Sequence, residues 1–451
     1  HEVFNIFKKK SGLSKVFIQT YGCQMNEYDT DKMFELLRAQ DFTPAISMED
    51  ADLVLLNTCS VREKAEQKVY SELGRMRRLK KLNPTMKIGV GGCVAQQEGA
   101  KILKRAQNVD FVFGTDNLIE LPEILRESDN GERTVHINRL APRQKVRDFI
   151  PEFPSSASHL PNLKAHLAIT KGCNNYCSFC VVPLTRGTEV SRSPQNILEE
   201  AIKLCRNGTR ELCLLGQNVN SYQADGVDFV ELLKNLDDIT GLQRIRFISP
   251  HPKDFHPQLA DAMADLPSVC EQLHLPLQSG SNSVLKRMRR WYTTQTYLEK
   301  VEMFCRRMPG GTISTDLIVG YPGETEEDFQ NTLEMMQRVR FDLIYAFKYS
   351  IRPGTRAADE ENHLSEEIKT ERLRILLETH ELILKEKHEE LLGSQQEILV
   401  EGPHPRETDS MSGRTRGNHS VVIRNTDAPS GSLLPVRITG FRTHLLEAEA
   451  I

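Results

Sequence analysis

Alternation between short β-rich runs and amphipathic helical patterns constrains the fold of this chain more than any other feature. From residue 15 to about 127, four β-rich runs alternate with four helical patterns, and this order predicts a parallel sheet covered by helices. We therefore expect an open parallel α/β sheet as the N-terminal domain, over 14–127. Its predicted strands are Val16–Thr20, Leu53–Asn57, Lys87–Val90 and Phe111–Phe113, and its predicted helices cover about 27–40, 62–82, 96–107 and 117–127.

The same alternation resumes after a segment over 128–163 that is rich in proline and serine and that reads as a linker. Six further strand and helix units predict a partial (β/α)6 barrel over 164–388, with its active face at the carboxyl rim of the strands. The predicted strands are 165–170, 211–215, 244–248, 272–276, 312–318 and 343–349, and the helices lie near 194–206, 228–238, 256–265, 294–307 and 325–338.

A long charged helix over about 364–392 ends at Gly393 and leads into the C-terminal segment. There, the runs 397–400, 420–423 and 434–439 read as short strands between turns rich in glycine and proline. This pattern predicts a small antiparallel β-barrel over 389–451. The expected fold class is thus α/β with a terminal all-β domain.

Composition narrows the class of protein. The 451 residues include 58 Lys and Arg against 62 Asp and Glu, so any nucleic-acid partner must bind to local basic patches. Ten cysteines are too few for a disulfide scaffold of this length. No run approaches the roughly 18 apolar residues of a membrane helix, and residues 1–10 lack the apolar core of a signal peptide. We expect a cytoplasmic protein without a membrane partner.

Three cysteines of the N-terminal domain each lie just beyond the carboxyl end of a predicted strand. Cys23 follows the first, Cys59 the second and Cys93 the third. Because ligands bind at this edge of an open α/β sheet, three thiols should converge on one rim. A single cysteine at such a place is about as often a small buried core residue, but three at equivalent positions favour a bound group.

Three more cysteines, Cys173, Cys177 and Cys180, occupy the loop after the first barrel strand. A loop of this length can place three thiolates on three irons of a cubane cluster and leave the fourth iron open. The alternative is a structural zinc site, which normally has four ligands. The remaining cysteines, 205, 213, 270 and 305, read as core residues.

The CxxxCxxC loop after a first barrel strand, with Phe179 before its last cysteine, resembles the radical S-adenosylmethionine (SAM) superfamily. The three upstream cysteines, together with a terminal barrel similar to a TRAM domain, resemble the methylthiotransferase family within it. Tyr321 and Ile351 depart from the residues usual in that family, but neither is a thiol.

Several stretches look like the MiaB branch of this family, which acts on an isopentenylated adenosine beside the tRNA anticodon. Sister branches act on a threonylcarbamoyl-adenosine of tRNA and on a ribosomal protein, and the first stretch favours the MiaB branch over both. The stretches are 19–26 (QTYGCQMN), 57–65 (NTCSVREKA), 215–222 (LGQNVNSY) and 410–415 (SMSGRT).

The resemblance implies two [4Fe-4S] clusters, one held by Cys173, Cys177 and Cys180 and an auxiliary one held by Cys23, Cys59 and Cys93. It implies that one SAM donates a methyl group and that a second is cleaved to a 5′-deoxyadenosyl radical, with sulfur delivered through the auxiliary cluster. An unactivated aromatic C–H has no proton for a side-chain base, so the cofactors carry the chemistry and we name no catalytic acid or base.

Polar residues on the predicted rim and just after the cluster loop are candidates for contact with SAM, against local capping roles. They are Arg186, Glu189, Gln217, Asn218, Ser249, Gln278 and Asp316. Basic residues near an aromatic side chain, and arginines of the terminal barrel, are candidates for RNA contact, although charge runs are usually solvated faces. They are Arg289, Arg290, Trp291, Arg414 and Arg416.

The expected partners are a tRNA anticodon stem-loop, a one-electron reductant similar to flavodoxin or ferredoxin, and a protein that donates sulfur or clusters. Two further readings stay open beside the tRNA enzyme: methylthiolation of another substrate, and an iron–sulfur or zinc protein that binds RNA without turnover.

Overall fold

The structure is a computed structural model that describes residues 14–60, 63–139 and 162–451. The chain forms two compact units, which we describe one at a time. The first contains the N-terminal sheet together with Lys171–Cys173 and Val181–Val190. The second contains the described residues up to Thr170 that follow the gap at 140–161, together with Asn174–Cys180 and Ser191–Ile451.

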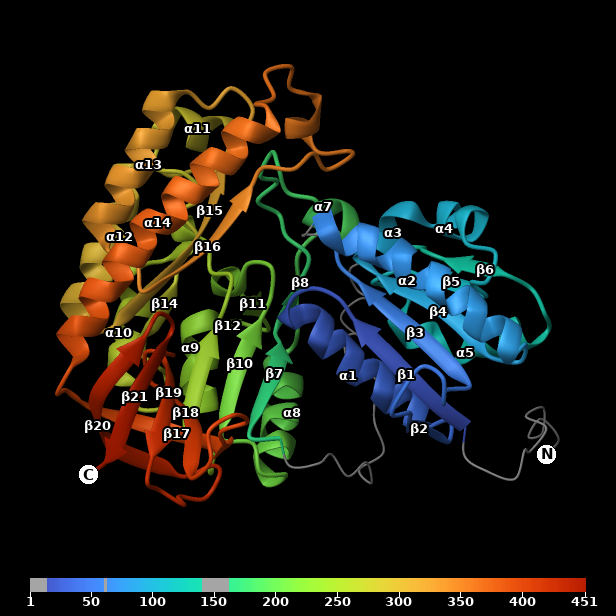
Figure 1. Cartoon of the computed structure of the whole chain (residues 1–451), viewed down its shortest axis with the longest axis horizontal. Coiled ribbons are helices and arrows are strands. Elements are labelled where there is room, and N and C mark those ends of the chain that lie inside the picture. Colours follow the sequence, from blue (N-terminus) through green and yellow to red (C-terminus); the bar gives the residue numbers. More distant parts are fainter. Residues whose placement is uncertain (1–13, 61–62, 140–161) are drawn as a thin grey trace. The chain divides into compact units, whose positions relative to one another are not determined.

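A six-stranded parallel sheet forms the centre of the first unit (Figure 1), in the order β2-β1-β3-β4-β5-β6. All four predicted strands are confirmed, and the prediction missed β2 and β6, which are only three residues long. Since β6 lies within the predicted linker, the sheet extends beyond residue 127; linker residues 140–161 lie outside the described residues. The strands are β1 Ser14–Thr20, β2 Phe42–Pro44, β3 Leu53–Thr58, β4 Lys87–Gly92, β5 Phe111–Phe113 and β6 Thr134–His136.

Helices cover both faces of this sheet. Along β3, Leu53 and Leu55 pack with α1 and α5 on one face, whereas Val54 and Leu56 pack with α2, α3 and α4 on the other. This alternation follows from the two-residue period of a strand, and burial on both faces explains why β3 is apolar over four successive residues. The helices are α1 Gln24–Arg38, α2 Glu63–Leu82, α3 Cys93–Glu98, α4 Ala100–Arg105, the short η1 Leu118–Glu120 and α5 Leu121–Asp129.

The second unit contains the predicted partial barrel, and all six of its strands are confirmed. They form two parallel three-stranded sheets, β13-β10-β7 and β14-β15-β16. An isolated parallel bridge pairs Ile245 of β13 with Val269, three residues before β14. The strands are β7 Lys164–Ala168, β10 Glu211–Leu215, β13 Arg244–Phe247, β14 Gln272–His274, β15 Thr312–Val319 and β16 Leu343–Lys348.

Helices on the outside of these strands bury one continuous apolar core. Two of them, α8 and α12, have the bounds that the sequence predicts. The helices are α8 Pro194–Arg206, α9 Phe229–Asp237, α10 Pro257–Asp265, α11 Asn282–Arg287, α12 Thr294–Arg307, α13 Glu326–Val339 and α14 Glu366–Leu391. Short elements of this unit are η2 Val219–Ser221, η3 Pro252–Asp254, η4 Arg356–Asp359, β11 Gln223–Ala224 and β12 Val227–Asp228. The helix α7 Val182–Thr185 belongs to the first unit, and the short strands β8 Thr170–Lys171 and β9 Val190–Ser191 each include residues of both units.

The C-terminal segment forms a closed five-stranded barrel, in the order β17-β18-β19-β21-β20. The prediction of a small β-barrel is therefore confirmed, although it missed two strands, β18 and β21. The barrel is also not wholly antiparallel as predicted, because β19 and β21 pair in parallel. The strands are β17 Gln395–Pro403, β18 Ser410–Thr415, β19 Ser420–Arg424, β20 Leu433–Arg442 and β21 Leu445–Ala450.

This small barrel docks at the amino ends of the partial-barrel strands. Arg244 donates to the carbonyl of Arg414 at 2.7 Å, and Arg246 donates to those of Thr415 and Arg416 at 2.9 and 2.7 Å. The amino ends lie opposite the carboxyl rim, so the small barrel does not cover that rim, which is formed by the loops that follow the strands.

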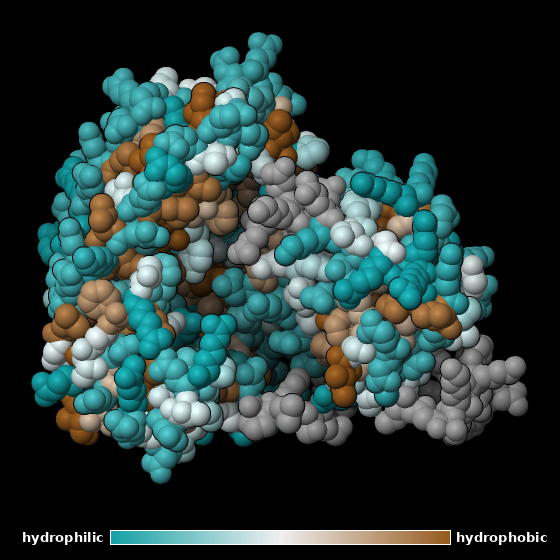
Figure 2. Space-filling view, viewed as in Figure 1, coloured by the Kyte–Doolittle hydropathy of each residue, from teal (hydrophilic) through white to brown (hydrophobic). Residues whose placement is uncertain are grey.

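Hydrophilic side chains cover most of the visible face of the second unit, and hydrophobic ones are scattered between them (Figure 2). Leu382 on α14 is 67% exposed, which is ordinary for a single apolar residue on a surface helix. Within the described residues, no helix has the length and apolar character to cross a membrane.

Candidate active site

Three thiols stand at the carboxyl ends of three neighbouring strands of the first unit. Cys23 follows β1, Cys59 follows β3 directly and Cys93 begins α3 directly after β4. Cys59 and Cys93 are buried, at 1% and 4% exposure, and Cys23 is half-buried. The order β1-β3-β4 makes these strands adjacent, so the thiols share one edge of the sheet.

Two glycines allow the loops to approach each other at this edge. Gly22 has a φ of +132°, and a Cβ there would lie 2.3 Å from the Cβ of Cys59. Gly92 has a φ of +91°, and a Cβ there would lie 2.4 Å from the carbonyl oxygen of Thr58. No other residue type could take either position without displacing the backbone or the thiol.

A buried amide network ties the loops together. Asn26 donates to the side chain of Asn57 at 3.2 Å and to the carbonyl of Thr58 at 2.9 Å, and Asn57 donates to the carbonyl of Asn26 at 2.7 Å. Thr58 donates to the carbonyl of Gly91 at 2.6 Å. Sequence reasoning did not single out these residues, although Asn26, Asn57 and Thr58 stood beside Cys23 and Cys59 in the quoted stretches.

Electrostatics favour a thiolate at Cys23. A hydrogen bond with Cys59 outweighs burial and, with the charge of Arg186, lowers the pKa of Cys23 to about 6. Arg186, 3% exposed, donates to Asp29 at 2.8 Å and to Asn26 at 3.3 Å. Burial opposes its charge, but Asp29, Cys93 and Cys23 favour the cation, and its pKa is raised. The structure thus places Arg186, a predicted SAM contact, beside the thiols of the first unit.

The segment that carries Arg186 is anchored to the first unit. The Lys171 ammonium lies 3.0 Å from the buried Asp116 carboxylate and donates to the carbonyl of Thr115 at 2.7 Å. Burial lowers the pKa of Lys171, while Asp116 opposes this shift. Thr115 also donates to the carbonyl of Thr185 at 2.6 Å. These contacts fix the position of α7 and of the predicted Glu189, which is half-buried in this unit.

The second set of thiols lies on the loop after β8. Cys173 and Cys177 are each 8% exposed, and Cys180 is half-buried. In the second unit, the amide of Cys180 donates to the carbonyl of Cys177 at 3.0 Å, and the Ser178 hydroxyl lies 2.9 Å from that of Tyr321. Tyr321, noted above as a departure from the family pattern, thus supports the loop.

Residues 288–291 lie against this loop. The amide of Ser178 donates to the carbonyl of Met288 at 3.1 Å, and the Trp291 indole N–H donates to the carbonyl of Asn175 at 3.4 Å. Between these two contacts, Arg290 donates to Cys177 Sγ at 3.3 Å.

Two of the predicted rim residues, Ser249 and Gln278, have strained backbones. They have φ values of +62° and +70°, and such conformations persist in non-glycine residues where the surroundings hold them, often at ligand sites. Gln278 follows β14 and is 8% exposed; its amide donates to the carbonyl of Asp316 at 2.8 Å.

The other predicted rim residues have local partners. Asn218 donates to Asp254 at 2.9 Å, and the carboxylate of Asp316, on β15, lies 3.5 Å from the imidazole of His274. Gln217 is half-buried directly after β10. These side chains lie at or near the carboxyl ends of β10, β13, β14 and β15, as the sequence predicts.

The residues predicted to contact RNA have different surroundings. Trp291 is 66% exposed and Arg289 is half-buried, whereas Arg290 is buried and its donors are directed inside the fold. Arg414 pairs with Glu401 at 3.4 Å, and Arg416 pairs with Glu271 at 2.7 Å and donates to the carbonyl of Val269. Arg416 therefore bridges the small barrel and the partial barrel. A correction also applies to Cys305, a predicted core residue, which is exposed on α12.

Thiol spacing bears on the kind of metal group. Among the residues that the structure describes, no three His, Cys, Asp or Glu side chains converge closely enough to hold a single metal ion. A structural zinc site binds all of its ligands to one ion, whereas a cubane cluster binds each cysteine to a different iron.

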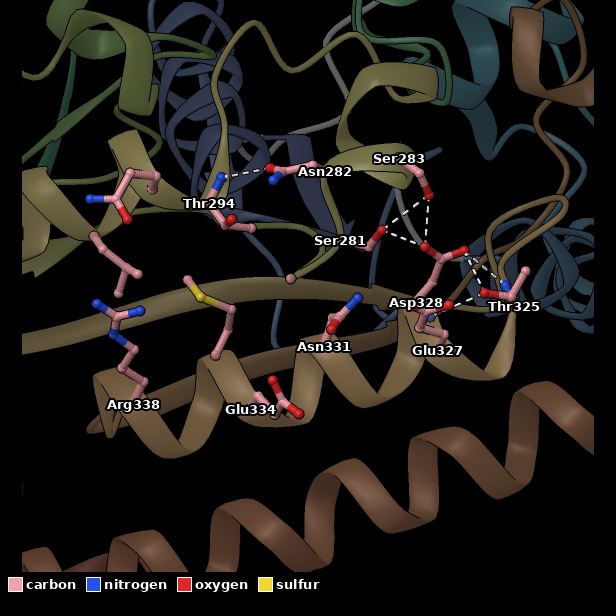
Figure 3. A pocket seen from close by; sticks show the side chains of 14 residues that line it. Ser281, Asn282, Ser283, Thr294, Thr325, Glu327, Asp328, Asn331, Glu334 and Arg338 are labelled. Atoms are coloured by element: carbon pink, nitrogen blue, oxygen red, sulfur yellow. Dashed lines mark hydrogen bonds between the residues drawn. The ribbon is translucent and has the colours of Figure 1, made fainter.

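A polar cavity of about 620 Å³ lies on the outer side of the second unit, between α11, α12 and α13 (Figure 3). Asp328 accepts hydrogen bonds from Ser281, from Ser283 at 2.7 Å and from Thr325 at 2.9 Å. Burial raises the pKa of Asp328, but these bonds outweigh it and lower the pKa to about 2. The carboxylate thus caps α13 and holds the turn that follows Gln278. No predicted cofactor residue lines this cavity.

Family models match three segments of the chain. Residues 15–114 match the "Uncharacterized protein family UPF0004", residues 167–336 the radical SAM superfamily, and residues 389–451 the TRAM domain. The first match covers the N-terminal sheet up to β5, the second covers the partial barrel from β7 to β15, and the third covers the small β-barrel.

Curated relatives match almost the whole chain. A tRNA-2-methylthio-N(6)-dimethylallyladenosine synthase from Bdellovibrio bacteriovorus is 45% identical over 94% of this chain and 92% of its own length. A protein of the same name from Moorella thermoacetica is 43% identical over 96% of this chain and 98% of its own.

Solved structures share the fold at low sequence identity. The radical SAM methyltransferase TsrM from Kitasatospora setae, with tryptophan and a SAM analogue bound, has a TM-score of 0.57 and 14% identity, covering 76% of this chain and 75% of its own. The same enzyme with cobalamin and a [4Fe-4S] cluster has a TM-score of 0.56 and 15% identity, with 77% of each chain covered.

Proposed function

Because this chain belongs to the family of tRNA-2-methylthio-N(6)-dimethylallyladenosine synthases within the radical SAM superfamily, we propose that it converts N6-dimethylallyladenosine at position 37 of tRNA to its 2-methylthio derivative. The dimethylallyl group is the isopentenyl group named above. The prediction of family, enzyme class and fold is confirmed. The similarity does not favour the sister substrates or an RNA-binding sensor without turnover.

Two separate sets of three thiols are the observation that carries the proposal. The chain uses SAM and [4Fe-4S] chemistry as a radical SAM protein. We assign one cluster to Cys173, Cys177 and Cys180, and an auxiliary cluster to Cys23, Cys59 and Cys93. The fit is supported by the lowered pKa of Cys23 and by Gly22 and Gly92, which leave room beside Cys59 and Thr58 respectively. When bound, these groups supply one-electron chemistry and sulfur that amino-acid side chains lack.

The chain's own residues bind, orient and exclude water. We propose that Gln217, Ser249, Gln278 and Asp316 contact SAM, with Asn218 in support. Gln217, Asn218, Ser249 and Gln278 follow the carboxyl ends of barrel strands, and Asp316 lies in the second half of β15, which supports this role. We propose that Arg186 and Glu189 act on the side of the auxiliary thiols, where Arg186 stabilises negative charge at Cys23 and Cys93.

For the RNA, we propose Arg289 and Trp291 as direct contacts, and Arg414 and Arg416 as residues that hold the TRAM domain in place. Trp291 is the only tryptophan of the chain, and its exposed ring can stack on a base. Its fluorescence should be quenched when an anticodon stem-loop binds. Arg289→Met should weaken binding without changing the fluorescence of the free protein. If the wild type showed quenching but Trp291→Ala bound the stem-loop with unchanged affinity, a stacking role for Trp291 would be contradicted.

Further partners follow from the chemistry. We propose a one-electron reductant similar to flavodoxin or ferredoxin, and a protein that resupplies sulfur or clusters. A cytoplasmic location is proposed because the substrate is tRNA.

The test is to incubate the anaerobically reconstituted full-length protein with SAM, dithionite and an anticodon stem-loop that contains N6-dimethylallyladenosine. Mass spectrometry of the nucleosides should show a thiomethyl gain on that adenosine. Matched stem-loops that contain plain adenosine or threonylcarbamoyl-adenosine should show none. A gain on the threonylcarbamoyl-adenosine RNA alone would overturn the substrate assignment.

A further inference from the structure

Arg290 is a buried cation beside the thiol of Cys177. We propose that Arg290 raises the reduction potential of the cluster held by Cys173, Cys177 and Cys180, by donating a charged N–H···S hydrogen bond to Cys177. Arg290 is then not an RNA contact but a positioning residue, which acts on the cluster through its ligand Cys177. The inference rests on the proposed function, because it takes these three cysteines as ligands.

The guanidinium uses its donors in three directions. Nη1 donates to Cys177 Sγ at 3.3 Å, Nη2 donates to the carbonyl of Pro276 at 3.1 Å, and Nε donates to the Tyr292 hydroxyl at 3.0 Å. The Tyr292 hydroxyl donates in turn to the carbonyl of Leu277 at 2.7 Å. The planar fork is thereby held in one orientation, with a single edge turned to the sulfur.

Backbone geometry directs Arg290 inward. The residues on both sides of it, Arg289 and Trp291, have left-handed backbones with φ values of +57° and +59°. Such conformations are costly in non-glycine residues and persist only where the surroundings hold them. Here the contacts of Met288 and Trp291 with the cysteine loop flank Arg290, so the strain coincides with the placement of this one side chain.

The charge of Arg290 lacks an acidic partner. Arg290 is 5% exposed, and within the described part of the chain its guanidinium forms no ion pair with a carboxylate. A buried charge is costly unless an opposite charge faces it. Burial lowers the pKa of Arg290, but Tyr292 and Cys177 favour the cation and the pKa is raised overall. The remaining anion is the Cys177 sulfur, which is a thiolate when it binds iron.

The rings of His251 and Tyr292 add no charge beside Arg290. His251 lies beside Tyr292, with ring centroids 5.7 Å apart. Burial, followed by the charges of Arg290 and Lys253, lowers the pKa of His251 to about 2, so the imidazole is neutral. Burial raises the pKa of Tyr292 to about 12, so the phenol is neutral as well. Arg290 is thus the fixed positive charge next to this sulfur.

A fixed positive charge with an N–H···S bond stabilises the state that carries one more electron. Hydrogen bonds to sulfur, net charge and burial are the levers by which a protein sets the potential of an iron–sulfur cluster. The electron comes from the one-electron reductant named above. Loss of Arg290 should therefore make the cluster harder to reduce.

The experiment is an EPR-monitored redox titration of the reconstituted full-length protein. The signal that changes when SAM is added is assigned to the cluster held by Cys173, Cys177 and Cys180. We expect Arg290→Met to lower the midpoint potential by about 59 mV or more, which is tenfold in the equilibrium constant for one electron. Arg290→Lys keeps the charge and should lie between Arg290→Met and the wild type. Lys286→Met, which removes an exposed charge from α11, should match the wild type.

A second readout separates potential from structure. SAM cleavage by Arg290→Met should be slow with a weak reductant and should recover with titanium(III) citrate. Equal potentials in Arg290→Met and the wild type would overturn the inference, as would loss of the cluster in Arg290→Met with an unshifted potential in Arg290→Lys. If the wild type itself assembled no SAM-responsive cluster, the proposed function would fail instead.

Discussion

At the scale of single residues, the loops that carry Cys23 and Cys59 can approach each other because glycine has no Cβ. Gly22 leaves room for the thiol of Cys59, and the Asn26 and Asn57 side chains then join the loops that follow β1 and β3. The rim is a pre-formed site for three thiols, because its backbone groups and amides already satisfy one another.

Gly22→Ala tests this view. The added methyl group would lie 2.3 Å from Cys59 Cβ at a φ that L-residues rarely adopt, so the Cys59 side chain must move. We expect reconstituted iron to fall from about eight to about four per chain, while SAM cleavage is kept.

The matched control is Gly74→Ala, because a Cβ at Gly74, in the middle of α2, meets nothing within 4 Å. That variant should bind iron as the wild type does, and should be more stable by about 0.5–1 kcal/mol from helix propensity. Full iron content in Gly22→Ala would show that the close approach is not needed.

At the scale of elements, the sequence predicts what depends on local periodicity. Strands such as β3 and β10 and helices such as α8 and α12 have long apolar patterns, and the prediction placed them within a few residues. The missed strands β2 and β6 are too short to show a pattern. The strand β18 contains Ser410, Ser412 and Gly413, which have low β propensity, so barrel closure determines it.

The candidate site shows the same division. The six cysteines could be named from their positions after strands, because that signal lies in the chain order. The burial of Arg290 could not be predicted from the sequence. It depends on the left-handed backbones of Arg289 and Trp291 and on a contact with Cys177, which is far away in sequence. From the sequence, Arg416 is predicted to be a cation available to RNA, but in the structure it forms an ion pair with Glu271.

Capping of α13 by Asp328 predicts a pH dependence. The folded-state pKa of Asp328 is about 2, below its ordinary value of 3.8, so the carboxylate stabilises the fold above pH 4 and this contribution is lost as pH falls through 2. Asp328→Asn should therefore lower the urea midpoint of the apoprotein most above pH 4. The difference from wild type should shrink between pH 4 and 2; a constant difference would contradict a role for the charge.

At the scale of the whole molecule, the TRAM domain and the partial barrel belong to one unit, joined through backbone carbonyls. Arg244, Arg246 and Thr312 donate to carbonyls of residues 414–417, and Arg416 returns an ion pair to Glu271. Because these contacts hold the TRAM domain in place, its surface keeps a fixed position relative to the rim of the partial barrel.

Arg416→Met and Glu271→Gln test whether Arg416 acts by docking. Each should raise KM for the stem-loop about threefold to tenfold, which corresponds to roughly 1 kcal/mol for a partly exposed ion pair. The double variant should be no worse than Arg416→Met alone, because Arg416→Met already removes the ion pair with Glu271 together with the bond to Val269. SAM cleavage without RNA should not change. An effect of Arg416→Met alone would indicate a direct contact with RNA.

The most direct test of the account is to count both products in the wild type and in Cys59→Ala. After reaction with SAM, reductant and dimethylallylated stem-loop, the wild type should form 5′-deoxyadenosine and the 2-methylthio nucleoside. Cys59→Ala, with about four irons per chain left, should form 5′-deoxyadenosine without the 2-methylthio nucleoside. Thiomethylated RNA from a Cys59→Ala protein that lacks the auxiliary cluster would contradict the division of labour between the two sets of thiols.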